Sequence, residues 1–360
     1  MQRSALVVGA SGIGGRYTAR ELLAHGWTVY GLARRPPTDL PGLIPVPADL
    51  MDPAALAGAF DTAFAGAAGA PTHVFITTWM RQASEAENIR VNAAMVRNVL
   101  DALRAAGSVK HVALVTGLKH YLGPFENYGK GSLPQTPFRE EQGRLDVENF
   151  YYAQEDEVFA AAERDGFTWS VHRPHTITGV AVGNAMNMAT TLAVYASICK
   201  ATGRPFVFPG SRVQWDSLTD MTDARLLAKQ LLWASTTPAA ANQAFNVTNG
   251  DVFRWSWMWQ QIADWFGVEA VPYPQQITPL AEQMTDDAEV WQQLAQKHGL
   301  READIDRLVS PWHTDADLGR PIEVVTDVSK SRRLGFTEFQ ASDQAFFDVF
   351  EKLRSERLIP

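Results

Sequence analysis

Short apolar runs alternate with amphipathic stretches along the first half of the chain, and the two patterns predict different elements. Buried strands are predicted at residues 5–8, 28–32, 44–47, 73–77, 112–115 and 167–173. Helices are predicted between several of them, at residues 17–25, 54–69, 85–106 and 148–165. This regular alternation indicates an α/β fold with a doubly wound parallel sheet of the Rossmann type, which we assign to residues 1–180.

The pattern changes after Pro174. An apolar helix is predicted at residues 185–201, and short strands follow at 206–208 and 213–215. A helix at 220–235 and a strand at 244–248 resume the earlier alternation, so we expect residues 216–250 to return to the sheet. The remaining segments hold most of the tryptophans and are predicted to form a smaller, mostly helical lobe that binds the substrate, made of residues 181–215 and 251–360.

The first predicted strand leads directly into a glycine-rich turn. Gly9, Gly12 and Gly15 precede the first helix, with Ser11 and Ile13 between them. In dinucleotide-binding folds, glycines at this place allow a tight turn, close approach of the backbone to the pyrophosphate, and close packing of helix on strand. The pyrophosphate then meets the N-terminus of the helix. The flanking strand and helix favour a dinucleotide site over a purely structural turn.

The residues after the second and third strands bear on which dinucleotide binds. Sites that prefer NAD usually place an acidic residue after the second strand, where it binds the ribose 2′-hydroxyl. This chain has Arg34 and Arg35 there, and guanidinium groups suit a 2′-phosphate. We therefore predict NADPH/NADP, with a solvated basic turn as the alternative. Asp49 is a candidate to bind the adenine amine, and equally to cap the next helix.

A lysine and a tyrosine are predicted to reach the same edge of the sheet. Lys119 follows the strand at 112–115, and Tyr151 lies in the first turn of the helix at 148–165. Ligands bind beyond the carboxyl ends of the strands in an open parallel sheet, which makes both side chains candidates for chemistry. The alternative is a solvated lysine and a core tyrosine. Carbonyl reductases on this kind of sheet usually carry YxxxK on one helix face, and no tyrosine of this chain has that spacing.

Composition narrows the class of protein further. The 360 residues carry a formal net charge of -8 with no basic stripe, which argues against nucleic-acid binding. No run of about 18 apolar residues predicts a membrane span, and the glycine-broken N-terminus is unlike a signal peptide. A single cysteine, Cys199, leaves no internal disulfide. We expect a cytoplasmic enzyme without a metal site, for which a homodimer is one open alternative.

Four longer segments carry a family resemblance. They are residues 116–125 (TGLKHYLGPF), 149–156 (NFYYAQED), 169–174 (WSVHRP) and 244–251 (AFNVTNGD). With the glycine turn and the arginine pair, they resemble the progesterone 5β-reductase and iridoid synthase family. Members of this family are atypical extended short-chain dehydrogenases that reduce activated C=C bonds with NADPH. The resemblance runs from the first strand to about Phe336 and so covers nearly the whole chain.

The resemblance implies roles for individual residues. Lys119 and Tyr151 take the positions of the family's catalytic lysine and tyrosine. Phe125 takes that of a phenylalanine in the substrate pocket, and we expect Trp79 and Tyr121 to line the same pocket. Cofactor contacts, with Gly9 and Gly15 of the turn, are implied for Ser11, Gly12, Ile13, Arg34, Arg35, Asp49, Leu50, Thr78, Ile177 and Met186.

The implied reaction is 1,4-reduction of an enone or enal, with Δ4-3-ketosteroids and small enones as candidate substrates. Tyr151 would stabilise the oxygen on which enolate charge accumulates, and Lys119 would lower the pKa of that phenol and hold the nicotinamide ribose. Reduction of an aldehyde or ketone by the same pair is one alternative, and a non-catalytic NADP-sensing regulator is another. Plant members usually have Gly-Asn where this chain has His175-Thr176, so the preferred substrate stays open.

Overall fold

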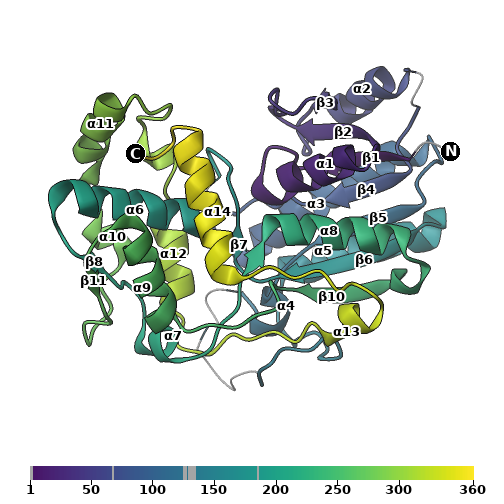
Figure 1. The fold of residues 1–360 in the computed structure, drawn as a ribbon. Coiled ribbons are helices and arrows are strands. Elements are labelled where there is room, and N and C mark those ends of the chain that lie inside the picture. Colours follow the sequence, from purple (N-terminus) through teal and green to yellow (C-terminus); the bar gives the residue numbers. More distant parts are fainter. Residues whose placement is uncertain (1–2, 67–68, 125–127, 129–134, 185) are drawn as a thin grey trace.

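A parallel sheet of seven strands forms the centre of the computed structural model, which describes residues 3–66, 69–124, 128, 135–184 and 186–360 (Figure 1). Its strands are β1 (Ser4–Val8), β2 (Thr28–Ala33), β3 (Leu43–Pro47), β4 (His73–Ile76), β5 (His111–Val115), β6 (Thr168–Pro174) and β10 (Gln243–Val247). They lie in the order β10-β6-β5-β4-β1-β2-β3. The order reverses between β1 and β4, and such a switch point is where open α/β sheets bind ligands.

Helices cover both faces of this sheet, as the apolar pattern of β1 requires. All five residues of β1 are buried, because Leu6 and Val8 pack on one face and Ala5 and Val7 on the other. The first face is covered by α2 (Pro53–Phe64), α3 (Glu85–Arg104) and α5 (Phe150–Asp165). The second is covered by α1 (Ile13–Ala24) and α8 (Ala224–Thr236). The predicted doubly wound fold is confirmed.

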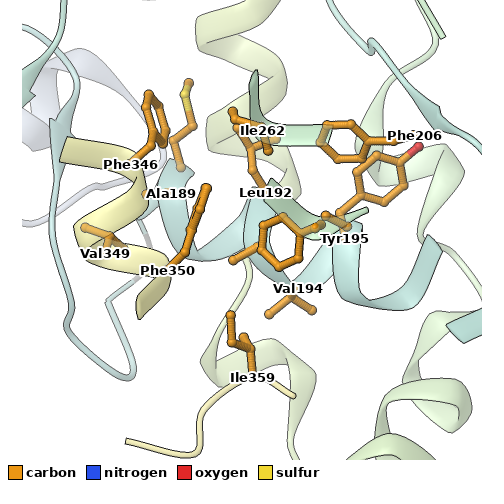
Figure 2. Close-up of a cluster of buried hydrophobic side chains, with 14 of the residues drawn as sticks. Ala189, Leu192, Val194, Tyr195, Phe206, Ile262, Phe346, Val349, Phe350 and Ile359 are labelled. Carbon is orange, nitrogen blue, oxygen red and sulfur yellow. The ribbon is translucent and has the colours of Figure 1, made fainter. Parts of the chain in front are cut away.

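A helical lobe lies beside the sheet, on the left in Figure 1. Its central helix is α6 (Met188–Thr202), which is buried on all sides from Met188 to Cys199 and therefore serves as the core of the lobe. Figure 2 shows Ala189 and Leu192 of this helix on the side of Phe346 and Phe350, and Val194 nearer Ile359. The other helices of the lobe include α9 (Trp255–Phe266), α10 (Leu280–Gln283), α11 (Asp287–His298), α12 (Pro311–Leu318) and α14 (Ser342–Ser355).

Short elements complete the described chain. The paired strands are β7 (Ile177–Thr178) with β9 (Thr222–Asp223), and β8 (Phe206–Val207) with β11 (Ala270–Val271). The short helices are α4 (Lys119–Leu122), α7 (Arg212–Asp216), α13 (Ser329–Arg333) and the 3-10 turns Pro238–Ala240 and Ile305–Arg307. None of the helices in the described ranges is both long and apolar enough to cross a bilayer.

Two details differ from the sequence-based expectation. Residues 213–215 were expected as a strand, but they form α7, which Ser211 caps by accepting a hydrogen bond from the Gln214 amide. The C-terminal segment was assigned wholly to the lobe, but α13 returns to the sheet, where Lys330 Nζ donates to the Ala244 carbonyl oxygen at 2.9 Å. The exact residue boundaries of the two parts stay a prediction.

Candidate active site

The glycine turn joins β1 to α1 at the switch point of the sheet. Gly9 has a φ of +87°, and a Cβ there would lie 2.7 Å from Thr78 Cβ, so only glycine fits. A Cβ on Gly15 would collide with the Gly9 carbonyl oxygen, so the third glycine lets α1 pack against the turn. Gly12 caps α1 without a side-chain hydrogen bond, and the first turn holds no acidic residue. The amides at this helix start therefore suit an anionic group.

Lys119 and Tyr151 are brought together by the cap of α5. Asn149 is the N-cap residue, and its side-chain oxygen accepts from the Tyr151 amide at 3.0 Å. Its Nδ2 donates to the Lys119 carbonyl oxygen at 2.7 Å. One buried amide thus fixes the start of α4 against the start of α5, across 30 residues of sequence. Sequence reasoning did not assign this role to Asn149, although an asparagine just before a predicted helix is a capping signal.

The Tyr151 hydroxyl lies against the backbone at the end of β5. A Cβ on Gly117 would come within 3.2 Å of Tyr151 Oη, so the glycine makes room for the phenol. The Lys119 ammonium lies 5.1 Å from the centre of the Trp79 ring and 4.9 Å from that of Phe150, which are cation–π distances. These contacts hold both functional groups in defined positions, with the two side chains almost fully buried.

Both side chains line one cavity of about 280 Å³. The predicted residues found in its lining are Gly9, Ser11, Gly12, Ile13, Thr78, Trp79, Lys119, Tyr151, Ile177 and Met186. The cavity therefore connects the glycine turn with the lysine and tyrosine at the carboxyl ends of the strands. This size and mixed lining are typical of a small-molecule site.

Burial dominates the electrostatics of the phenol. It raises the pKa of Tyr151 well above the usual 10, and the charges of Tyr128 and Glu85 raise the same pKa further. The sequence led us to expect a lowered pKa through Lys119, and the direction in the folded chain is the opposite. Removing a phenolate from water is costly, and the charges of Tyr128 and Glu85 act in the same direction as burial. The phenol of Tyr151 therefore keeps its proton at neutral pH.

Several predicted residues lie away from this cavity. Gly15 is packed beneath the turn, and Arg34, Arg35, Asp49 and Leu50 lie at the ends of β2 and β3, where the first three are exposed. The cap of α2 is Asp52 rather than Asp49, which settles that alternative against Asp49 as the cap. The adenine role of Asp49 stays a prediction.

Two other residues, Tyr121 and Phe125, were predicted to line the substrate pocket. Tyr121 was expected in the pocket, but its ring is buried against Phe138 at 5.0 Å, and its hydroxyl donates to Asn246 Oδ1 at 2.6 Å. Because these contacts hold Tyr121 in the core beside β10, it does not line the described cavity. Phe125 lies outside the described residues.

Sequence reasoning missed the wall that the lobe contributes. His313, Asp317 and Arg320 come from α12 and the turn after it, and they line the cavity together with His175 and Thr176. The signal available in the sequence was the four-residue spacing of His313 and Asp317, which places both on one helix face. Only the fold brings that face to the sheet, because about 160 residues separate α12 from Tyr151.

Together, the fold and the cavity define the class of protein. It is a Rossmann-fold protein with a candidate active site between the sheet and a helical lobe. The PRISE-like Rossmann-fold domain model matches residues 66–360. The (S)-8-oxocitronellyl enol synthase ISY1 of Nepeta cataria is 38% identical over 99% of this chain and 93% of its own length. The 3-oxo-Delta(4,5)-steroid 5-beta-reductase of Arabidopsis thaliana is 37% identical, with 99% and 93% covered. The chain belongs to the PRISE-like family, which confirms the resemblance.

Solved structures extend the comparison at the level of the fold. The epimerase Mth375 of Methanothermobacter thermautotrophicus superimposes with a TM-score of 0.70 at 15% identity, covering 98% of this chain and 93% of that one. At this identity the likeness concerns the fold alone. It agrees with the extended Rossmann architecture inferred from the sequence.

Proposed function

We propose that this protein is an NADPH-dependent reductase of activated C=C bonds, acting on enones or enals. The observation that carries the proposal is the shared cavity, in which Lys119 and Tyr151 face the same space as the Gly9–Gly14 turn. The family supports it, since one relative bears the name of a steroid 5-beta-reductase. The function predicted from the sequence is thus the one that the site and the relatives favour.

The residues present fit a nicotinamide dinucleotide. A Cβ on Gly12 would meet nothing closer than the Gly9 carbonyl oxygen at 3.5 Å, so the backbone there is open to a phosphate. Arg34 and Arg35 are exposed at the end of β2, and neither forms an ion pair with any residue that the structure describes. Two guanidiniums available at this position favour a 2′-phosphate and hence NADPH. When bound, NADPH supplies the hydride for the β-carbon of the substrate.

Tyr151 is the proposed donor to the carbonyl oxygen. Negative charge accumulates on that oxygen as the C=C bond is reduced, and a fixed donor stabilises the charge where it develops. The raised pKa of Tyr151, caused first by burial, suits this role because the hydroxyl keeps its proton. The hydrogen bond that the Tyr151 amide donates to Asn149 and the close fit against Gly117 orient the phenol before the substrate binds.

Lys119 is the proposed source of positive charge beside the phenol. Its ammonium is held over the rings of Trp79 and Phe150, so little freedom remains to be lost when the reactive geometry forms. A cation close to the developing enolate lowers the energy of that charge, and the effect is larger where the side chains are buried, as Lys119 and Tyr151 are. The same ammonium is expected to bind the nicotinamide ribose.

The products formed from 2-cyclohexenone with NADPH test this function. We expect cyclohexanone, the product of 1,4-reduction, with consumption of an equal amount of NADPH. The allylic alcohol as main product would instead indicate 1,2-reduction of the carbonyl by the same pair. Absence of NADPH consumption across a broad panel of enones and aldehydes would contradict both reductases and favour a cofactor-sensing regulator.

A further inference from the structure

Lys119 and Tyr151 lie on different elements, so no single helix fixes the distance between them. The residue four positions after Tyr151 in α5 is Glu155, which is buried and pairs with Arg144 at 2.9 Å. Lys119 instead begins α4, a single turn of four residues. A helix this short is not stable by itself, and its N-cap residue, Leu118, forms no side-chain capping bond. The position of Lys119 therefore depends on contacts from outside α4.

The Tyr152 side chain provides one of these contacts. Its hydroxyl donates to the His120 carbonyl oxygen at 2.6 Å and accepts from the Leu145 amide at 3.0 Å. The rings of Tyr152 and His120 also pack edge to face, with 5.4 Å between their centres. Because the Tyr152 side chain is almost fully buried, loss of its hydroxyl would leave the buried carbonyl without this donor.

Asn149 makes the companion bond to the neighbouring carbonyl of α4. Its Nδ2 donates to the Lys119 carbonyl oxygen at 2.7 Å. The carbonyl oxygens of Lys119 and His120 are thus both held by side chains from the start of α5, which also carries Tyr151. Two bonds to adjacent carbonyls fix the orientation of the turn as well as its distance, because a rotation of the turn about one bond stretches the other.

We propose that Tyr152 is a positioning residue whose hydroxyl, together with the Asn149 amide, holds the turn that carries Lys119 in place relative to Tyr151. This inference rests on the proposed reductase function and deepens it, since it explains how the chain positions the pair without a YxxxK helix. Tyr152 is not among the residues that line the described cavity, so it acts through Lys119 and not on the substrate. A displacement of about 1 Å at a reacting centre can lower a rate about a hundredfold.

The variant Tyr152→Phe removes the hydroxyl and keeps the ring. The values of kcat and KM for 2-cyclohexenone with NADPH are measured for this change in the wild-type chain and in a Lys119→Met chain. In the wild-type chain we expect kcat to fall about tenfold and KM to change less than about twofold. In the Lys119→Met chain the same change should alter kcat less than about twofold, because no ammonium is left to misplace. An equal fall in both chains would overturn the proposal.

A second variant, Asn149→Ser, tests the same arrangement with Tyr152 intact. Serine keeps a capping oxygen for the Tyr151 amide but loses the donor to the Lys119 carbonyl oxygen. We expect its effect on kcat to depend on Lys119 in the same way. A fall in kcat that is the same with and without the Lys119 side chain would show that the bond stabilises the fold without positioning the ammonium.

Tyr195→Phe is the matched control. Tyr195 of α6 is buried like Tyr152, and its hydroxyl donates to Gln283 Oε1 at 2.5 Å and accepts from the Val207 amide at 3.2 Å. It is not among the residues lining the described cavity. Its replacement removes the same kind of bond pair within the lobe, so it should lower stability but leave kcat near that of the wild type. A fall in kcat as large as that of Tyr152→Phe would contradict a role specific to Lys119.

Hydrogen exchange separates this proposal from the reductase function, because it needs no substrate. The Leu122 and Gly123 amides donate to carbonyl oxygens at the start of α4, and their exchange reports how often this turn opens. In Tyr152→Phe they should exchange about tenfold faster, and in Tyr195→Phe at the wild-type rate. If no enone is reduced, the proposed function fails, but this faster exchange would still support the positioning of α4. Unchanged exchange in Tyr152→Phe would contradict it even in an active reductase.

Discussion

At the scale of single residues, the Tyr151 hydroxyl is the group on which the proposed reaction depends most. Replacing it with Tyr151→Phe removes one oxygen from a side chain that otherwise keeps its contacts with Phe150 and Gly117. Loss of one donor to a developing oxyanion should lower turnover of an enone roughly a hundredfold or more. NADPH affinity, measured by fluorescence titration, should change little.

Tyr30→Phe is the control for this loss of a phenolic hydroxyl. Tyr30 lies in β2, its hydroxyl donates to the Gly69 carbonyl oxygen at 2.7 Å, and it is not among the residues that line the described cavity. We expect it to lower stability slightly and leave turnover near that of the wild type. Wild-type turnover in Tyr151→Phe would show that Tyr151 has another role.

Replacement of Arg34 and Arg35 tests whether the protein prefers NADPH to NADH. With both replaced by alanine, NADPH should bind much more weakly while NADH binding changes little, because only NADPH carries the 2′-phosphate. Titrations with both cofactors measure the two affinities. Arg90→Ala removes an exposed arginine of α3 that pairs with Glu87, and should leave the preference intact. Equal losses of NADPH and NADH affinity would contradict the 2′-phosphate role.

Some of the candidate site residues could be predicted from the sequence, but their surroundings could not. Lys119 and Tyr151 were found because each follows a predicted strand or begins a predicted helix at the ligand-binding edge, and the structure does bring them into one cavity. The direction of the Tyr151 pKa was not predictable, since it depends on how completely the fold buries the phenol. Tyr121 could not be excluded from the pocket for a similar reason: its partner Asn246 is 125 residues away.

At the scale of elements, the packing of α1 on the glycine turn gives a sharp test. A methyl group at Gly15 would collide with the Gly9 carbonyl oxygen and lie 2.8 Å from Thr77 Oγ1. Gly15→Ala should therefore displace the helix, destabilise the protein by about 1–3 kcal/mol and weaken cofactor binding. Thermal unfolding and NADPH titration measure the two effects.

Gly58→Ala is the matched helical control. Gly58 lies in α2, and a Cβ there would meet nothing within 4 Å. The same substitution should raise stability by about 0.5–1 kcal/mol, since alanine loses less backbone freedom in a helix than glycine does. If Gly15→Ala were equally stabilising, the close packing of α1 on the turn would not be what requires glycine.

Elements with a clear period were predicted well, and short ones were not. The alternation Val213-Gln214-Trp215 suggested a strand, but Ser211 followed three residues later by Gln214 is a helix-start signal, and it prevailed. The polar face of α12 was missed because a helix pattern does not indicate which neighbour it meets. In the fold, Arg81 stacks over Trp312 at 4.1 Å and ties α12 to the loop after β4, beside the cavity.

At the scale of the whole molecule, the sequence predicted the sheet because each central strand is apolar on both faces, as a sheet covered by helices on both sides requires. The return of α13 to β10 was not predictable, since it rests on single contacts such as that of Lys330 with the Ala244 carbonyl. Nor was the burial of histidines in adjacent strands, which gives the molecule a specific response to acid.

His111 in β5 and His172 in β6 are joined through Ser170, whose Oγ lies 3.0 Å from His111 Nε2 and 2.9 Å from His172 Nε2. Burial lowers the pKa of His111 to about 3 and that of His172 to about 4. In the unfolded chain both would titrate near 6.5, so the unfolded state binds protons first. The contribution of these neutral histidines to the free energy of unfolding is therefore present above pH 6.5. It falls as the pH decreases toward 4, by about 2 kcal/mol per histidine between pH 7 and pH 5.

Urea unfolding at pH 7 and pH 5 measures this loss, and His172→Gln isolates one share of it. The variant should be less stable at pH 7, because its bond to Gln230 at 2.8 Å is altered, but its further loss on going to pH 5 should be about 2 kcal/mol smaller than that of the wild type. His298→Gln changes an exposed histidine of α11 and should keep the wild-type difference. A His172→Gln protein that lost as much stability as the wild type between these pH values would show that protonation of this buried pair does not drive the acid response.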